Sequence, residues 1–240
     1  MKINIYNSPA ETMQHLADYF VTIAKACIED KGRFTVALSG GSSPKNLYEL
    51  LSSELYKNAL DWNKVYFFFG DERYVPLTDK DSNYLMARKA LFEPLQIADD
   101  HVFAVDTRLP PDDAAKDYES SMKVFFGNEH IRLDLVLLGL GDNSHTASLF
   151  PHTTVLHDKA PAVKALYVEE IKAYRVTMNA PLINEARHVA FLVYGKEKAV
   201  AVHHILQDKT DIEKFPAQLI NPTNGELVWF IDNEAAEKFT

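Results

Sequence analysis

Short runs of apolar residues, each followed by a segment with helical spacing, constrain the fold of this chain more than any other feature. The runs are Phe34–Leu38, Val65–Phe69, residues 133–138 and residues 189–194. Strands that are apolar throughout must be covered on both faces, which is typical of a parallel sheet. The sequence therefore predicts an α/β fold: an open, mostly parallel, Rossmann-like sheet with helices on both faces.

Other segments extend this pattern along the whole chain. We expect further strands at Lys2–Tyr6 and residues 164–168, 175–178 and 227–231, and helices at residues 9–31, 44–51, 82–92, 112–126 and 196–206. Pro9 suits the start of the first helix, and Gly32 suits its end. The polar stretch 207–225 leaves too few residues after it for another domain. The sequence predicts a single domain spanning residues 1–240.

The net charge of −9 argues against a nucleic-acid partner, because phosphate backbones require a basic surface. An anionic small molecule would need a local cluster of donors and cations instead. No apolar run is long enough for a membrane span, and the N-terminus lacks the features of a signal peptide. Cys27 is the single cysteine, so we expect a cytoplasmic protein without disulfides.

Ligands of open parallel sheets bind outside the carboxyl ends of the strands, and three strands here end in polar loops. The first loop contains Ser39, Gly40, Gly41, Ser42 and Ser43. Its glycines allow close backbone approach, and the following helix N-terminus favours an anion such as phosphate. A tight turn with Ser43 as a helix N-cap is an equally good interpretation of these residues.

The second and third loops carry the charged and titratable candidates. Gly70 to Arg73 holds three consecutive charges, and on spacing alone an ordinary solvated turn would explain them. In the third loop, Gly139 to His145, we expect His145 to begin a helix reaching about Phe150. The positive helix end would lower the histidine pKa and favour a neutral general base. A histidine that merely caps the helix is the alternative.

Metal and cofactor motifs are absent from the sequence. It has no Cys-x-x-Cys, His-Glu-x-x-His or Gly-x-Ser-x-Gly pattern, and its first loop is neither a Walker A loop nor a Gly-x-Gly-x-x-Gly loop. We therefore expect no metal and no cofactor.

Several segments along the chain together form a recognisable pattern, at residues 37–44, 71–76, 81–84, 139–151, 175–184 and 195–199. The string His-Thr-Ala-Ser-Leu-Phe-Pro from His145 is the most specific of them. With these segments the chain resembles the 6-phosphogluconolactonase family, in the glucosamine/galactosamine-6-phosphate isomerase superfamily. The resemblance implies a fold similar to glucosamine-6-phosphate deaminase and hydrolysis of 6-phospho-D-glucono-1,5-lactone to 6-phosphogluconate, in the oxidative pentose phosphate pathway, with no metal or cofactor.

With this substrate, each candidate receives an expected role. The phosphate would be held by Ser39, Gly40, Gly41, Ser42, Arg175 and Lys198. His145 would take a proton from the attacking water, and Arg73 with amides of the Gly139–Gly141 loop would stabilise the oxyanion. Asp71 and Glu72 would position Arg73.

One pair departs from the family pattern. The family has Asp-Gly immediately before the histidine, whereas this chain has Asn143 and Ser144. Asn143 offers only a neutral amide oxygen to orient His145, and Asp142 is the other candidate for that task. Serine in place of glycine suggests that the backbone at Ser144 need not be left-handed.

Two other functions remain as alternatives. A glucosamine-6-phosphate deaminase would share the fold and phosphate loop, but such enzymes place an acid in the run after the histidine, and residues 146–151 contain none. A non-catalytic sugar-phosphate sensor would usually carry a DNA-binding helix pair, and neither such a domain nor a basic patch is evident.

Overall fold

The computed structural model describes residues 1–127 and 130–239 and contains a six-stranded sheet. Its strands are β1 (Lys2–Tyr6), β2 (Phe34–Leu38), β3 (Val65–Phe69), β5 (Leu135–Leu138), β8 (His188–Val193) and β9 (Glu226–Asp232). They lie in the order β1-β9-β8-β5-β2-β3, and every pairing between them is parallel. The predicted parallel sheet is therefore confirmed.

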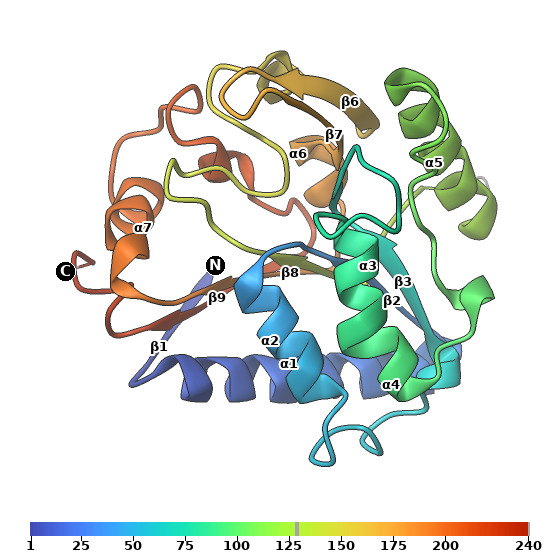
Figure 1. Cartoon of the computed structure of the whole chain (residues 1–240). Coiled ribbons are helices and arrows are strands. Elements are labelled where there is room, and N and C mark those ends of the chain that lie inside the picture. Colours follow the sequence, from blue (N-terminus) through green and yellow to red (C-terminus); the bar gives the residue numbers. More distant parts are fainter. Residues whose placement is uncertain (128–129, 240) are drawn as a thin grey trace.

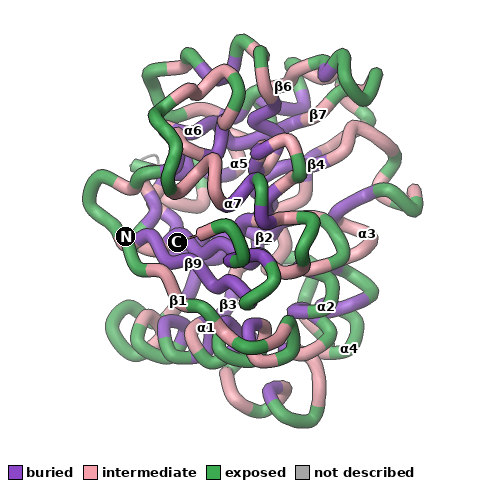
Figure 2. The backbone as a smooth tube through the Cα atoms, turned by 90° about the vertical axis from the view of Figure 1, so that its left-hand side faces the viewer, coloured by how far each residue is buried: buried purple, intermediate pink, exposed green. Residues whose placement is uncertain are grey.

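Helices cover both faces of this sheet (Figure 1). They are α1 (Pro9–Lys31), α2 (Ser42–Leu51), α3 (Asn83–Ala87), α4 (Glu93–Leu95), α5 (Pro111–Phe125), α6 (Ala180–Ile183) and α7 (Ala199–Leu206). Val36 and Leu38 pack in one apolar cluster with α1 and α2, whereas Ala37 packs in another with α5, α6 and α7. Because successive side chains of a strand point to opposite faces, apolar residues at every position were needed. Figure 2 shows β2 and β9 buried at the centre.

The first helix shows how local chemistry sets the ends of an element. The Ser8 hydroxyl accepts a hydrogen bond from the Glu11 amide at 3.2 Å, and Pro9 occupies the first helical position. Gly32 ends the helix with φ 77°, and its amide donates to the Ile28 carbonyl. None of the helices in the described parts of the chain is long and apolar enough to cross a membrane.

A second, antiparallel sheet lies beside the first and was not predicted. It contains β4 (Asp71–Arg73), β7 (Ala173–Met178) and β6 (Val163–Val168), in the order β4-β7-β6. The interpretation of the charged segment Asp71–Arg73 as a solvated turn is wrong, because it pairs with β7 and buries Asp71 and Glu72. Figure 1 shows β6 and β7 above the parallel sheet, on the side opposite α1.

Asp134 ties together the starts of two central strands. Its carboxylate is fully buried and accepts hydrogen bonds from the Thr35 amide at 2.9 Å and the Thr35 hydroxyl at 2.8 Å. Lys31 forms an ion pair with the same carboxylate, and Arg187 Nε lies 3.4 Å from it. Removing one partner of a buried ion pair is strongly destabilising, because the other partner is left without a compensating charge.

We predict that Asp134→Ala lowers the free energy of unfolding by about 3–5 kcal/mol, because it leaves Lys31 and Thr35 without their partner. Urea unfolding measures the change. Glu54→Ala is the control: it removes an exposed ion pair with Lys57 and should change stability by less than about 1 kcal/mol. Equal effects of the two substitutions would contradict the role of Asp134.

Candidate active site

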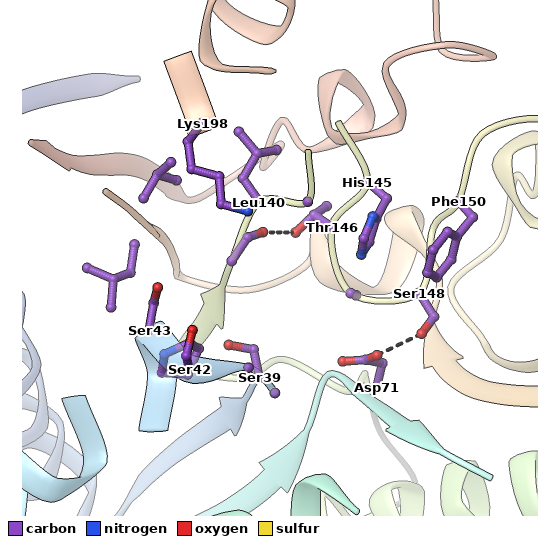
Figure 3. Close-up of a pocket in the computed structure, with 18 of the residues that line it drawn as sticks. Ser39, Ser42, Ser43, Asp71, Leu140, His145, Thr146, Ser148, Phe150 and Lys198 are labelled. Carbon is purple, nitrogen blue, oxygen red and sulfur yellow. Dashed lines mark hydrogen bonds between the residues drawn. The ribbon is translucent and has the colours of Figure 1, made fainter. Parts of the chain in front are cut away.

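The carboxyl ends of four parallel strands surround a cavity of about 320 Å³. Its walls include the first loop after β2, Asp71 and Arg73 after β3, the third loop after β5, and Lys198 after β8. In Figure 3, Ser39, Ser42 and Ser43 lie on one side of the cavity, and His145, Phe150 and Asp71 lie on the other. The structure thus brings the three predicted loops together.

The first loop is fixed by a buried tyrosine. The Tyr48 hydroxyl accepts a hydrogen bond from the Ser39 amide at 2.9 Å and donates to the Ser39 carbonyl at 2.8 Å. The Ser39 hydroxyl is buried and has no hydrogen-bond partner among the described residues. A buried polar group of this kind calls for a ligand, because leaving it unpaired is costly.

The start of α2 faces the same cavity without a side-chain cap. The interpretation of Ser43 as the N-cap is wrong: α2 begins at Ser42, Gly41 is the capping residue with φ 109°, and no side chain within the described chain bonds to this end. Helix N-termini leave amide donors unsatisfied, so the first turn can hold an anion. Gly40 has no room for a side chain, since a Cβ atom would lie 1.9 Å from Asn83 Oδ1.

Glu72 anchors the second loop to the start of α3. Its buried carboxylate accepts hydrogen bonds from the amides of Arg73, Asn83 and Tyr84, at 2.7, 2.7 and 2.8 Å. Burial raises the pKa of Glu72, while these backbone donors oppose the increase. Glu72 therefore fixes the backbone of Arg73 rather than its guanidinium, which donates instead to the Asp81 carbonyl at 2.8 Å.

Pairing of β4 with β7 gathers charged side chains on one face. Asp71 pairs with Thr177 and Arg73 pairs with Arg175, and residues opposite one another share a face. Asp71, Arg73 and Arg175 all line the cavity. Burial lowers the pKa of Arg175, and nearby Asp71 opposes this decrease.

Asp71 is held by a residue that the sequence analysis did not assign. Its Oδ2 accepts a hydrogen bond from the fully buried Ser148 hydroxyl at 2.7 Å (Figure 3). The Ser148 amide donates to the Thr177 hydroxyl. Ser148 belongs to the string that starts at His145, which was the available signal for it. The expected pairing of Asp71 with the Arg73 side chain is replaced by this contact.

His145 lies between two turns, so the predicted helix is wrong. Residues 146–149 form a tight turn with Ala147 at φ 48°, and the imidazole stacks on Phe150 with ring centroids 4.1 Å apart. The pKa of His145 is lowered as predicted, but the cause is burial and not a helix end. Asp71 and Glu170 only partly oppose this decrease. Because the pKa remains lowered, the neutral imidazole is favoured at neutral pH.

The turn before His145 is tightly specified. Ser144 has φ 63°, so the expectation that its backbone need not be left-handed is wrong. The Gly141 amide donates to the His145 carbonyl at 2.8 Å, and the Ser144 amide donates to the Gly141 carbonyl at 2.9 Å. A Cβ atom at Gly141 would lie 2.1 Å from His145 Nδ1. These contacts place the imidazole and require glycine at position 141.

Asp142 and Asn143 have separate partners. Lys198 Nζ lies 2.6 Å from Asp142 Oδ1, so Asp142 holds Lys198 at the cavity wall and does not orient the histidine. His145 Nδ1 lies 2.5 Å from Asn143 Oδ1. Within residues 1–127 and 130–239, no group of three or more His, Cys, Asp or Glu side chains is placed to hold a metal ion.

Comparison with known proteins identifies a matching family and similar sequences and structures. The model of a family described as glucosamine-6-phosphate isomerases/6-phosphogluconolactonase matches residues 7–229. A 6-phosphogluconolactonase of Synechocystis is 42% identical over 221 residues, covering 90% of this chain and 88% of the relative. The structure of 6-phosphogluconolactonase from Trypanosoma cruzi superposes with a TM-score of 0.86 at 32% identity, covering 100% of this chain and 97% of that one.

A monomeric glucosamine-6-phosphate deaminase has a TM-score of 0.79 at 22% identity, covering 99% of this chain and 100% of that one. At this identity the likeness concerns the fold, and it confirms the predicted similarity to that enzyme's architecture.

We predict that Gly141→Ala displaces the His145 imidazole toward water, because the new methyl group occupies its position. Relief of burial should then raise the pKa of His145, measured by NMR titration. Gly139→Ala is the matched control, since nothing lies within 4 Å of a Cβ atom there. A His145 pKa that is unchanged in Gly141→Ala would contradict the packing described here.

Proposed function

Because the chain belongs to the glucosamine-6-phosphate isomerase/6-phosphogluconolactonase family, we propose that it hydrolyses 6-phospho-D-glucono-1,5-lactone to 6-phospho-D-gluconate. The observation that carries this proposal is a single cavity with an anion-binding loop on one side and a neutral histidine on the other. The reaction is the second step of the oxidative pentose phosphate pathway, and we propose that it takes place in the cytoplasm.

The phosphate binds at the first loop. The unpartnered Ser39 hydroxyl, the amides of Gly40, Gly41 and Ser42, and the free start of α2 supply hydrogen-bond donors. Arg175 and Lys198 supply positive charge, which the overall charge of −9 makes necessary. Lys198 keeps Asp142 as its partner on the outer side, which holds its ammonium group at the cavity wall.

His145 acts as general base on water. As the water oxygen bonds to the lactone carbonyl carbon, its proton passes to the imidazole. The carbonyl oxygen becomes negative and is stabilised by Arg73. The Gly141 amide takes no part in this, because it donates to the His145 carbonyl. When the bond from this carbon to the ring oxygen breaks, the imidazolium returns its proton to that oxygen, and the carboxylic acid product ionises in water.

The alternative function, glucosamine-6-phosphate deamination, would require an acidic residue after the histidine that this chain does not have. Residues 146–151, which follow His145, contain no carboxylate, and the carboxylate at the same wall, Asp71, is bonded to Ser148. Both close relatives described above carry the lactonase name.

We predict that His145→Ala lowers kcat by about 10²–10⁴-fold, the usual contribution of a positioned acid–base group, while the protein remains folded. Loss of the lactone signal by NMR measures turnover, with spontaneous hydrolysis subtracted. His130→Ala, which removes an exposed histidine bonded to Glu185 outside the cavity, is the control. Full activity of His145→Ala at initial rate would remove His145 from the mechanism.

We predict that kcat/KM falls as pH decreases through a His145 pKa below the usual value for histidine, because the protonated imidazole cannot accept the water proton. Asp71→Asn removes the largest of the effects that raise this pKa, so the fall should move to lower pH. The substrate phosphate also titrates near pH ~6, so the pKa of His145 is measured directly by NMR of the free enzyme. Asp113→Asn, at an exposed position of α5, should leave the pKa of His145 unchanged. A shift of this pKa to higher pH in Asp71→Asn would contradict the prediction.

A further inference from the structure

A contact between the turn that joins β6 and β7 and the third loop reaches His145. The turn between β6 and β7 places Glu170 next to Asn143, whose Nδ2 donates to both carboxylate oxygens of Glu170, at 3.0 and 2.9 Å. The Oδ1 of the same amide lies 2.5 Å from His145 Nδ1 and accepts from the His145 amide at 3.3 Å. Glu170, Asn143 and His145 thus form a continuous chain of hydrogen bonds.

The chemistry of these groups allows one direction for that chain. An ionised carboxylate only accepts hydrogen bonds, so it must face the NH₂ group of the Asn143 amide. The amide oxygen, which also only accepts, then faces His145 Nδ1. A neutral imidazole carries one proton, and this contact requires that proton on Nδ1. The lone pair is left on Nε2.

We propose that Glu170 is a positioning residue that fixes the tautomer of His145 through the Asn143 amide. This inference rests on the proposed function, since the tautomer with a free Nε2 is the one that serves as base. Without Glu170, the amide of Asn143 could rotate and present its NH₂ group to Nδ1. That orientation would favour the proton on Nε2 and remove the base. Glu170 itself is exposed and does not line the cavity.

The Glu170 carboxylate also affects the pKa of His145 through its charge. Asp71 and Glu170 favour the protonated imidazole, whereas Lys198 and Arg175 disfavour it. Loss of the Glu170 charge alone would therefore lower the pKa of His145 slightly and leave more of the neutral form. If Glu170 acts only through its charge, its removal should leave activity near neutral pH unchanged or raise it. If Glu170 fixes the tautomer with the proton on Nδ1, its removal should lower activity. The two effects have opposite signs.

The test compares Glu170→Ala with Glu169→Ala, which removes the neighbouring exposed carboxylate and the same charge. We expect Glu170→Ala to lower kcat by about 10- to 100-fold, the usual cost of losing a group that orients a functional histidine, with little change in KM or Tm. Glu169→Ala should behave like the unmodified chain. Equal kcat values in the two variants would overturn the proposal.

A second experiment, in the Asn143→Asp variant, distinguishes control of the His145 tautomer from a structural role of Glu170 in the turn between β6 and β7. In Asn143→Asp, either carboxylate oxygen accepts from Nδ1, so the imidazole no longer needs Glu170. The carboxylate of Asn143→Asp would also repel Glu170, which lies within about 3 Å of this side chain. Glu170→Ala introduced into Asn143→Asp should therefore lower kcat by less than about 3-fold or raise it, a strong coupling between the two positions. If the full loss persists in that background, Glu170 acts on the fold and the proposal fails.

Nitrogen NMR of the imidazole provides a readout that does not depend on turnover. Above its pKa, His145 of the unmodified chain should show the proton on Nδ1, and Glu170→Ala should show a mixture of tautomers. A proton on Nε2 in the unmodified chain would overturn the inference. If the chain leaves the lactone unhydrolysed but shows this tautomer response, the proposed function fails and the positioning role stands.

Discussion

Parallel pairing of β2 with β3 and β5 is the constraint on which the site depends. Leu38 pairs with Phe69 across β2 and β3, and Ala37 pairs with Val136 across β2 and β5, so the three strands end at the same edge. The loops that follow them therefore meet, and the first loop, β4 and the third loop line one cavity. A shift of one residue in any of these pairings would turn every side chain to the opposite face.

Buried hydrogen bonds then fix the conformation of these loops around the cavity. Tyr48 holds both backbone groups of Ser39, Glu72 holds three backbone amides, and Ser148 holds Asp71. The contact of Ser148 with Asp71 joins segments 77 positions apart in the sequence. The contacts of Tyr48 and Glu72 fix the backbone conformation of the loops that they reach. The hydrogen-bond donors and charges are therefore in place before a substrate arrives, which is the condition for electrostatic stabilisation of a transition state. We propose that Asn143 and Glu170 extend the same principle to the tautomer of His145.

The parallel sheet and its three loops could be predicted because burial on both faces leaves a strong local pattern. The short strand Asp71–Arg73 could not, since three charged residues carry no apolar alternation and their burial depends on partners in β7 and α3. The turn after His145 was mistaken for a helix because the left-handed backbone of Ala147 follows from tertiary packing and not from local propensity. Glu170 was missed because its partner Asn143 lies 27 positions away, and no motif joins them.

We propose above that this cavity hydrolyses a phosphorylated sugar lactone. The most direct test follows freshly prepared 6-phosphogluconolactone by NMR with the purified chain, and supplies glucosamine 6-phosphate in a parallel sample. We expect loss of the lactone well above its spontaneous rate, formation of 6-phosphogluconate, and no ammonia from the amino sugar. Loss of the lactone at the spontaneous rate would contradict this proposal, and release of ammonia would assign the cavity to deamination.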